Sequence, residues 1–332
     1  FFMANMLPEE HGKLEPPWQN MNEPIDHHYI PVFYLSRWAG TDGRVCRFSR
    51  PYQQETIAKR LVPKGTAFEP GLYSAQDQPP QLAQTMEKHF MAPLDMQAAK
   101  ALDFLESAPS EKDWTSGLRS SWSRFMLTQM LRAPEDIAQL KSATTQDWSS
   151  AIHELEAIYA AQRLEGDPET VQEYLSLQSP GEIDKLSFKI ARTLMDHPAV
   201  GQTINNMHWI VLNVSKDELP LLTSDRPIWM TTTFFEEDAF ISMPIGPRKL
   251  FLAAPQISTI QRIEMRSRRQ LVKAVNKIVV QHSVKFVYGI DNRSLKFVQK
   301  HMATRRHASL LERLAVRRGH EIVADIDRVI IG

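Results

Sequence analysis

Two short segments of the chain place ionisable and hydroxyl side chains beside apolar residues, where chemical sites are often built. We call residues 26–35 (DHHYIPVFYL) the His-Tyr segment and residues 221–228 (LLTSDRPI) the Ser-Asp segment. An imidazole in the first can serve as a general acid, a general base or a metal ligand. A carboxylate in the second can orient an imidazole, bind a metal or activate water. These segments are therefore the first places to look for a site.

His28 is the catalytic candidate of the His-Tyr segment, with Tyr29 and Pro31 in support. Pro31 predicts a short helix through about Trp38, because a proline in the first position of a helix loses no needed N–H group. The unpaired N–H groups of that first turn attract anions. The alternative is a histidine that hydrogen-bonds to the chain and braces the turn. His27 is expected at the surface.

Asp225 is the catalytic candidate of the Ser-Asp segment, with Ser224 in support. It follows a predicted strand, so its carboxylate can face a site at the end of that strand. The alternative is that Ser224 and Asp225 only cap an Asx or Ser turn. A serine nucleophile is not supported, since no Gly-x-Ser-x-Gly elbow surrounds Ser224.

Three charged residues on predicted helices extend the candidate site. Glu87 is the third catalytic candidate, although an acid near a helix start also favours the helix dipole. Arg132 and Arg124 are candidate anion-binding residues, about two turns apart on a similar face. The alternatives are a dipole partner for Arg132 and a solvated face for Arg124. A functional role requires Glu87 and Arg132 to face one cleft.

The formal net charge of zero hides a strong asymmetry along the chain. Residues 262–318 hold fifteen Lys or Arg against three acids, a net charge of +12 that the rest of the chain balances. Such a basic stretch is typical of proteins with a phosphate-rich partner, so nucleic acid is a candidate partner. Alternatively, the basic surface pairs with the acidic remainder or is simply solvated. The residues expected on one exposed face are Arg266, Arg268, Arg269, Lys273, Lys277, Arg305 and Arg306.

Composition bounds the remaining choices. A chain of 332 residues, 42% hydrophobic and 23% charged, can bury a full core and is ordinary for a soluble globular protein. No apolar run approaches the roughly 20 residues that span a bilayer, and no secretory signal is recognised, so we expect no membrane partner. The single cysteine, Cys46, excludes an internal disulfide and a thiolate-rich metal cage, which fits the cytoplasm. The oligomeric state is not set by the sequence.

Hydrophobic periodicity predicts an α+β fold, with a helical middle section packed with a mixed or antiparallel sheet built mainly from the C-terminal half. We expect an extended arm at residues 1–24 and a single domain at 25–332, helical at 82–206, sheet-rich at 207–290 and ending in basic helices. The predicted helices are 82–104 with an interruption near Pro93, 112–131 ending before Pro134, 147–164, 182–195, 266–281 and one from Leu295. The predicted strands are 44–48, 209–214, 221–223, 228–232, 240–243, 250–253 and 284–288.

These landmarks resemble an uncharacterised, mainly bacterial family, domain of unknown function four-two-three-eight. Its His-Tyr-x-Pro-x-Phe-Tyr-Leu and Thr-Ser-Asp-x-Pro motifs match residues 28–35 and 223–227. Arg226 departs from the family, where a small or amide residue is more usual. The resemblance spans about residues 27–290 and implies architecture and candidate positions, but no reaction. Other matching positions are 45–48, Leu72, Tyr73, Glu87, Gln129, Arg132, Pro134, Trp209, 243–247 and, as a supporting site residue, Asn276.

Two functional hypotheses follow from the candidate residues. The first is a metal-dependent hydrolase, acting on phosphodiesters, with His28, Asp225 and Glu87 around a divalent cation. The basic C-terminal helices would then hold the polyanion. The second is a non-catalytic ligand- or protein-binding module that uses the same turns. No phosphate-binding loop, His-Glu-x-x-His pair, dinucleotide fingerprint or Cys-x-x-Cys is present. The observation that separates the hypotheses is whether the three side chains converge.

Overall fold

The computed structural model describes residues 26–52, 55–75, 83–107, 113–150, 156, 159–160, 163–164, 166–177, 180–216, 218–231 and 238–306. The predicted N-terminal arm at 1–24 and the basic residues after 306 lie outside these ranges. Helices dominate the middle of the chain and antiparallel sheets follow, so the predicted α+β class is confirmed. Within the described part, no helix is long and apolar enough to cross a bilayer.

In the described residues, ten short strands form three sheets, and every strand pair among them is antiparallel. A four-stranded sheet has the order β5 (His208–Asn213), β9 (Lys249–Ala254), β8 (Ile241–Gly246), β7 (Trp229–Met230). A second has the order β3 (Ile57–Leu61), β2 (Val45–Ser49), β10 (Val287–Gly289), β6 (Thr223–Ser224). The third pairs β1 (Asp26–His28) with β4 (Phe68–Pro70). β6 and β7 belong to different sheets, so the Ser-Asp segment carries the chain from one to the other.

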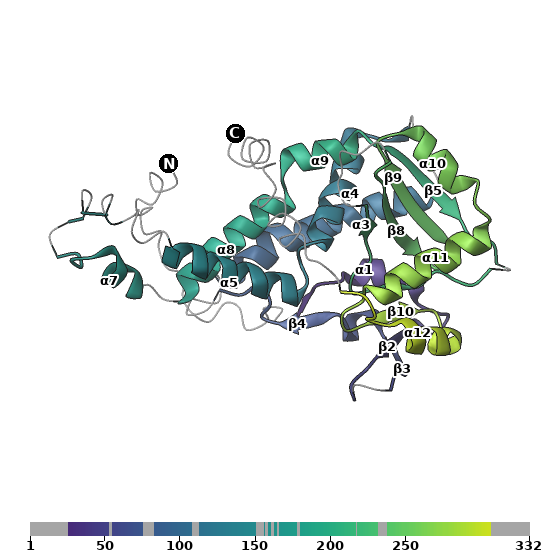
Figure 1. Ribbon diagram of the computed structural model, residues 1–332, viewed down its shortest axis with the longest axis horizontal. Helices are drawn as coiled ribbons and strands as arrows, with labels where there is room; N and C mark the ends of the chain where they lie inside the picture. The colour runs from purple at the N-terminus through teal and green to yellow at the C-terminus, as the bar shows by residue number, and fades with distance from the viewer. Residues whose placement is uncertain are drawn as a thin grey trace.

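Helices cover both faces of the β5-β9-β8-β7 sheet (Figure 1). Leu250 and Leu252 on β9 pack with Ile260, Leu271 and Val275 on α10 and α11, while Phe251 faces the larger core formed with α3 and α4. This alternation follows the two-residue period of a strand. The helices are α1 (Val32–Leu35), α3 (Ala92–Glu106), α4 (Ser116–Gln129), α5 (Pro134–Ser150), α7 (Val171–Ser176), α8 (Pro180–Met195), α9 (Pro198–Asn205), α10 (Ile257–Glu264), α11 (Arg268–Gln281) and α12 (Leu295–His301).

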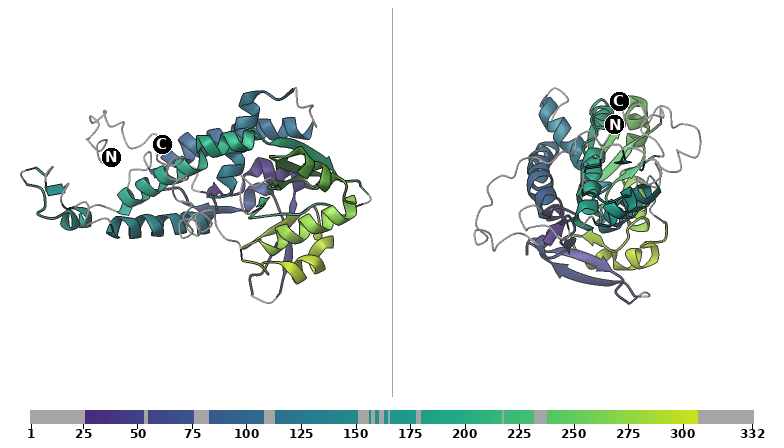
Figure 2. Two further views of the ribbon diagram at one scale, coloured as in Figure 1. Left: turned by 45° about the horizontal axis from the view of Figure 1, so that its top comes forward. Right: turned by 90° about the vertical axis from the view of Figure 1, so that its left-hand side faces the viewer.

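Short helical turns and an elongated helix pair complete the fold. The 3-10 turns are Ser36–Trp38, Pro63–Gly65 and Asn292–Ser294, and a π-helical turn covers Glu87–Met91. α5 and α8 pack against each other and extend away from the body of the molecule (Figure 1, Figure 2). α11 and α12 also contact each other, on the side opposite that extension.

Two prolines act differently from the sequence prediction. The helix predicted from residue 82 changes form near Pro93: a π-helical turn ends at Met91 and α3 begins at Ala92, with Pro93 in its first turn, where a missing N–H is tolerated. Pro134 ends the preceding helical run as predicted, but it also begins α5, which the sequence placed from residue 147. α10, β3 and β4 were not predicted either, since each is a short element without a long periodic pattern.

The His-Tyr and Ser-Asp segments contact each other through buried side chains. The Tyr34 hydroxyl lies 2.8 Å from Thr223 Oγ1 and donates to the carbonyl oxygen of Pro244 at 2.6 Å. The Trp38 indole N–H donates to the carbonyl oxygen of Leu221 at 2.8 Å. Both side chains are fully buried. The helix that Pro31 initiates therefore positions one segment directly on the other.

Replacing Tyr34 with Phe should lower the free energy of unfolding by about 1–3 kcal/mol, because Thr223 and the Pro244 carbonyl would lose a buried partner. Urea denaturation followed by circular dichroism measures the change. Tyr52→Phe is the matched control, since Tyr52 is 79% exposed. Equal stability of both variants would show that the Tyr34 hydroxyl is not a structural link.

Candidate functional site

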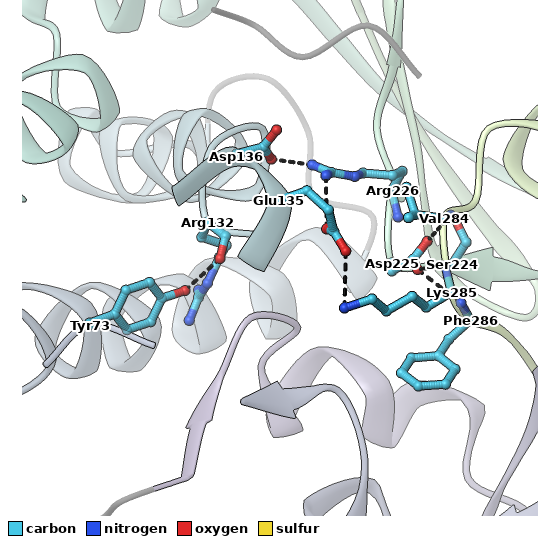
Figure 3. A network of polar contacts seen from close by, with 10 residues as sticks. All are labelled: Tyr73, Arg132, Glu135, Asp136, Ser224, Asp225, Arg226, Val284, Lys285 and Phe286. Carbon is cyan, nitrogen blue, oxygen red and sulfur yellow. Dashed lines mark hydrogen bonds and ion pairs between the residues drawn. The ribbon is translucent and has the colours of Figure 1, made fainter. Parts of the chain in front are cut away.

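Arg132 lies between α4 and α5 and organises a buried polar cluster. Its guanidinium donates through Nη1 and Nη2 to both oxygens of Asp95 at 2.8 and 3.1 Å, and through Nη2 to the carbonyl oxygen of His28 at 2.6 Å. Its own carbonyl oxygen accepts from the Tyr73 hydroxyl at 2.7 Å (Figure 3). Arg132 is 1% exposed, so this charge depends on its partners.

The prediction that His27 lies at the surface is wrong. His27 is fully buried and stacks on Tyr73; its Nε2 lies 2.7 Å from Gln84 Oε1, and its Nδ1 accepts from the Tyr73 N–H. His28 is partly exposed, and its Nε2 lies 3.1 Å from the carbonyl oxygen of Lys64. Burial is the main cause that lowers the pKa of His28, so its imidazole favours the neutral form.

Glu87 lies in the π-helical turn that precedes α3. Burial raises the pKa of its carboxyl group, while the charge of Arg132 opposes that shift and the charge of Asp95 adds to it. The same two residues also influence the imidazole of His28. Arg132 and Asp95 therefore act electrostatically on both Glu87 and His28.

Asp225 is engaged by the backbone of the segment that leads into β10. Its carboxylate accepts N–H groups from Val284 at 2.9 Å, Lys285 at 2.5 Å and Phe286 at 2.8 Å (Figure 3). Burial raises the pKa of Asp225, and these donors oppose the rise. Ser224 Oγ accepts from the Arg226 N–H at 3.1 Å. The Ser224 contact matches the turn-capping alternative. Asp225 instead binds the backbone of a segment distant in sequence, so it has a structural partner but does not cap its own turn.

A second set of ion pairs holds the start of α5 to the Ser-Asp segment. Arg226 donates through Nη1 to Asp136 and through Nη2 to Glu135 at 3.3 Å, and Glu135 also pairs with Lys285 Nζ at 3.1 Å (Figure 3). Arg226 and Asp136 are both buried. The buried charge of Arg226 is therefore balanced by an acid on α5.

The other candidate residues take structural positions. Arg124 pairs with Asp196 at 2.6 Å on an exposed face. Pro31 is the N-cap of α1. The Asn276 amide accepts from the Leu222 N–H at 2.8 Å and donates to the Pro220 carbonyl at 3.0 Å, which fastens α11 to β6. Tyr29 is buried, and burial together with nearby phenol and carboxyl groups, including Asp225, raises its pKa.

The candidate residues thus divide into two groups on either side of residues 132–136. His28 and Glu87 lie with Arg132, whereas Asp225 lies with Arg226 and the chain at 284–286. No hydrogen bond or ion pair among the described residues joins Asp225 to His28 or Glu87. In that part of the chain, no group of three or more His, Cys, Asp or Glu side chains is placed to hold a metal ion. The metal-centred arrangement of the three is absent there.

The sequence did not point to Asp95 or Gln84, which are hydrogen-bond partners of Arg132 and His27. Asp95 follows Glu87 by eight residues, about two helical turns, and that spacing could have placed it on the same face. Gln84 carries no comparable signal, because its contact with His27 joins residues 57 positions apart.

A basic surface forms separately on α11 and α12. Arg269, Lys273 and Lys277 are exposed at intervals of four residues, opposite the side of α11 that packs on the sheet. Burial and the charges of Lys277 and Lys300 lower the pKa of His301, which places these residues of α11 and α12 near one another. Within the described residues, no acid pairs with Arg266, Arg269, Lys273, Lys277, Lys296, Lys300 or Arg305. We call these seven residues and His301 the basic face.

Two further observations define the basic face. The Arg305 N–H donates to the carbonyl oxygen of Gln281 at 3.0 Å, which brings Arg305 to the end of α11. Arg268 is half-buried, and its Nη1 donates to the Glu264 carbonyl at 3.4 Å. Arg306 is exposed but already interacts with another group of the protein, so it is not counted in the basic face. The predicted pairing with acids of the middle helices is not seen for the seven cations in the described chain.

Comparison with known proteins places the chain in one family. The model described as Protein of unknown function (DUF4238) matches residues 26–293, most of the chain, so the chain belongs to that family. No curated protein and no solved structure matches it. The resemblance inferred from the two motifs is confirmed, and the family description brings no activity with it.

Replacing Arg132 with Met should lower the free energy of unfolding by about 3 kcal/mol, because it leaves Asp95 and the His28 carbonyl without their buried donor. Arg124→Met removes an ion pair with exposed partners and should cost at most about 1 kcal/mol. Chemical denaturation of both variants beside the wild type measures the difference. Losses of the same size would contradict a central structural role for Arg132.

Replacing Glu87 with Gln should stabilise the protein at neutral pH but not below about pH 4, the ordinary range of a glutamate. The raised pKa of Glu87 means that the folded chain holds this proton more tightly than the unfolded chain. The free energy of unfolding therefore decreases as the pH rises from about 4 through the raised pKa of Glu87 in the folded chain. The uncharged Gln removes this decrease. Urea titrations at several pH values, with the exposed Glu55→Gln as control, measure it. A Gln variant less stable than wild type at pH 7 would contradict the raised pKa.

Proposed function

We propose that this member of the DUF4238 family is a non-catalytic binding module for double-stranded nucleic acid, which it holds by the phosphate backbone with the basic face. The observation that carries the proposal is the row of exposed cations on α11 and α12 without acidic partners in the described chain. Arg269, Lys273 and Lys277 span about 12 Å along the helix. A duplex carries one negative charge per roughly 1.7 Å of its axis, so several phosphates lie within their reach.

The first turn of α11 adds a physical argument. It holds Arg268 and Arg269 and no acid, although the positive end of a helix dipole favours acids. Two cations there cost stability, and the cost is offset when an anion binds at the same end. This arrangement is unfavourable for the isolated helix and favourable for a complex with phosphate.

The choice of a duplex rests on the absence of stacking platforms. Proteins that hold single strands combine cations with exposed aromatic rings on which bases stack. On described α10, α11 and α12 and the residue that ends α10, the exposed large apolar residues are Ile257 and Met265, and neither is aromatic. The ring of Phe297 on α12 is partly buried against the core. Phosphate contact without stacking supports binding that does not depend on sequence.

The hydrolase hypothesis is supported less well by the geometry. It needs His28, Asp225 and Glu87 around one cation, whereas Asp225 already accepts three backbone N–H groups. The rival hypothesis is tested in the binding experiment itself, by incubating the duplex with the protein and Mg²⁺, Mn²⁺ or Zn²⁺. Cleavage that is lost in Glu87→Gln would favour the hydrolase and overturn the non-catalytic proposal.

The binding test uses a labelled duplex of about 30 base pairs, as DNA and as RNA, in anisotropy titrations at low and moderate salt. The wild type should bind, with a slope of log K against log salt of about −0.9 per phosphate contact on DNA. Arg269→Glu/Lys273→Glu/Lys277→Glu should weaken binding at least about tenfold and make the slope shallower by up to about 3.

Lys100→Glu/Lys189→Glu/Lys216→Glu is the matched control, since it changes the net charge equally at exposed positions outside the basic face. It should bind nearly as well as the wild type. No binding at low salt, or equal loss in both triple variants, would overturn the basic face as the binding surface.

A further inference from the structure

One strand at a sheet edge lacks the features that normally protect such edges. An edge strand presents unpaired N–H and C=O groups that attract another strand, and proteins protect it with short length, charged side chains, prolines or bulges. Among the edge strands of the described sheets, β1, β4, β6 and β7 have only two or three residues each. β3 is longer but carries Lys59 and Arg60. All of these edges are therefore protected.

β5 is the outermost strand of its sheet and has none of these protections (Figure 1). Its six residues, His208–Asn213, read HWIVLN and include no proline and no Lys, Arg, Asp or Glu. All six pair with β9 in one register without a bulge. α10 contacts both β5 and β9, so it covers the face of the sheet and not its edge. Among the described residues, no hydrogen bond reaches the outer side of the β5 backbone.

The apolar side chains of β5 remain partly exposed at this edge. Ile210 packs on the side of α10 and α11, whereas Trp209 and Val211 pack on the side of the larger core. All three side chains are only partly buried. A further strand beside β5 would cover both sides, and the removal of apolar surface from water would stabilise the pairing.

A second copy of the chain is the partner that this edge fits. Two identical strands can pair antiparallel about a two-fold axis, so the edge is complementary to its own copy. With Val211 on the axis, Ile210 lies opposite Leu212 of the partner subunit. An axis at Ile210 would instead place the polar His208 opposite that leucine. Matching of apolar side chains across the strands therefore favours the axis at Val211.

We propose that two copies of this chain pair through β5 into a homodimer, in which the four strands of each copy join into one antiparallel sheet. The two-fold axis is perpendicular to that sheet, because this axis sets two equivalent edge strands antiparallel within one sheet. Equivalent faces of the two copies then lie on the same side. Since α10 and α11 cover one face of the sheet, both basic faces lie on one side of the dimer.

The dimer goes beyond the proposed function and does not depend on it. One consequence does rest on that function: two basic faces on one side hold a duplex more tightly than one face, because the second contact forms at a high effective concentration. The dimer is tested without nucleic acid, so its failure and the failure of duplex binding are separate results.

Analytical ultracentrifugation of the full chain at about 50 µM should give twice the 38.1 kDa of one copy, because a micromolar affinity suffices at that concentration. Val211→Lys sets two ammonium groups against each other at the axis and should reduce the mass to that of one copy. Ile57→Lys, the same kind of change on the protected edge β3, is the matched control and should stay dimeric. Circular dichroism melts check that each variant is folded. A monomeric wild type, or a folded Val211→Lys that stays dimeric, would overturn the proposal.

Cysteine cross-linking tests the same pairing without a charged variant. Directly opposite residues of an antiparallel pair have Cα atoms about 4.5–5.5 Å apart, within the range of a disulfide. Val211→Cys should therefore form a disulfide-linked dimer with oxidised glutathione as the oxidant. The two cysteines of Asn213→Cys would lie roughly 13 Å apart and should stay unlinked, and the native Cys46 is buried. No cross-link in Val211→Cys, or equal cross-linking in both variants, contradicts pairing through β5.

Discussion

The burial of the Arg132 charge is the constraint on which the site depends. Moving a guanidinium out of water costs several kcal/mol unless partners replace the solvent. Asp95 on α3 and the carbonyl of His28 on β1 supply them. Because each partner belongs to a different element, satisfying one charge fixes how α3, β1 and the end of α4 sit together. The position of His28 and the surroundings of Glu87 follow from that arrangement.

Residues 132–136 are held from both sides by charge. Arg132 faces the His-Tyr segment, and Glu135 and Asp136 face Arg226 of the Ser-Asp segment. The His-Tyr and Ser-Asp segments thus meet the same short junction between α4 and α5. Their polar residues are largely used in holding this junction. This explains why a motif rich in ionisable residues does not by itself indicate catalysis.

The elements that could be predicted from sequence are those with long periodic patterns. α4, α8, α11, β5 and β9 lie close to their predicted ranges, because a helix stripe or strand alternation is a local property. The burial of His27 rather than His28 could not be predicted. Adjacent residues of a strand point to opposite faces, and which face is inside depends on the pairing of β1 with β4, about 40 residues away. Pro134 could be assigned to an end or a start, since proline permits both. The electrostatic influence of Arg132 on Glu87 depends on long-range packing that no local pattern shows.

The passage of the Ser-Asp segment between two sheets has a consequence for how the molecule unfolds. β6 and β7 are separated by only four residues, and Asp225, one of these four, binds the segment that leads into β10. Opening either sheet therefore pulls directly on the anchor of the other. We therefore expect the two sheets to open together as one cooperative unit, in the sense used for hydrogen exchange. We expect local fraying first in parts away from this link, such as the end of the α5 and α8 pair that extends from the body of the molecule.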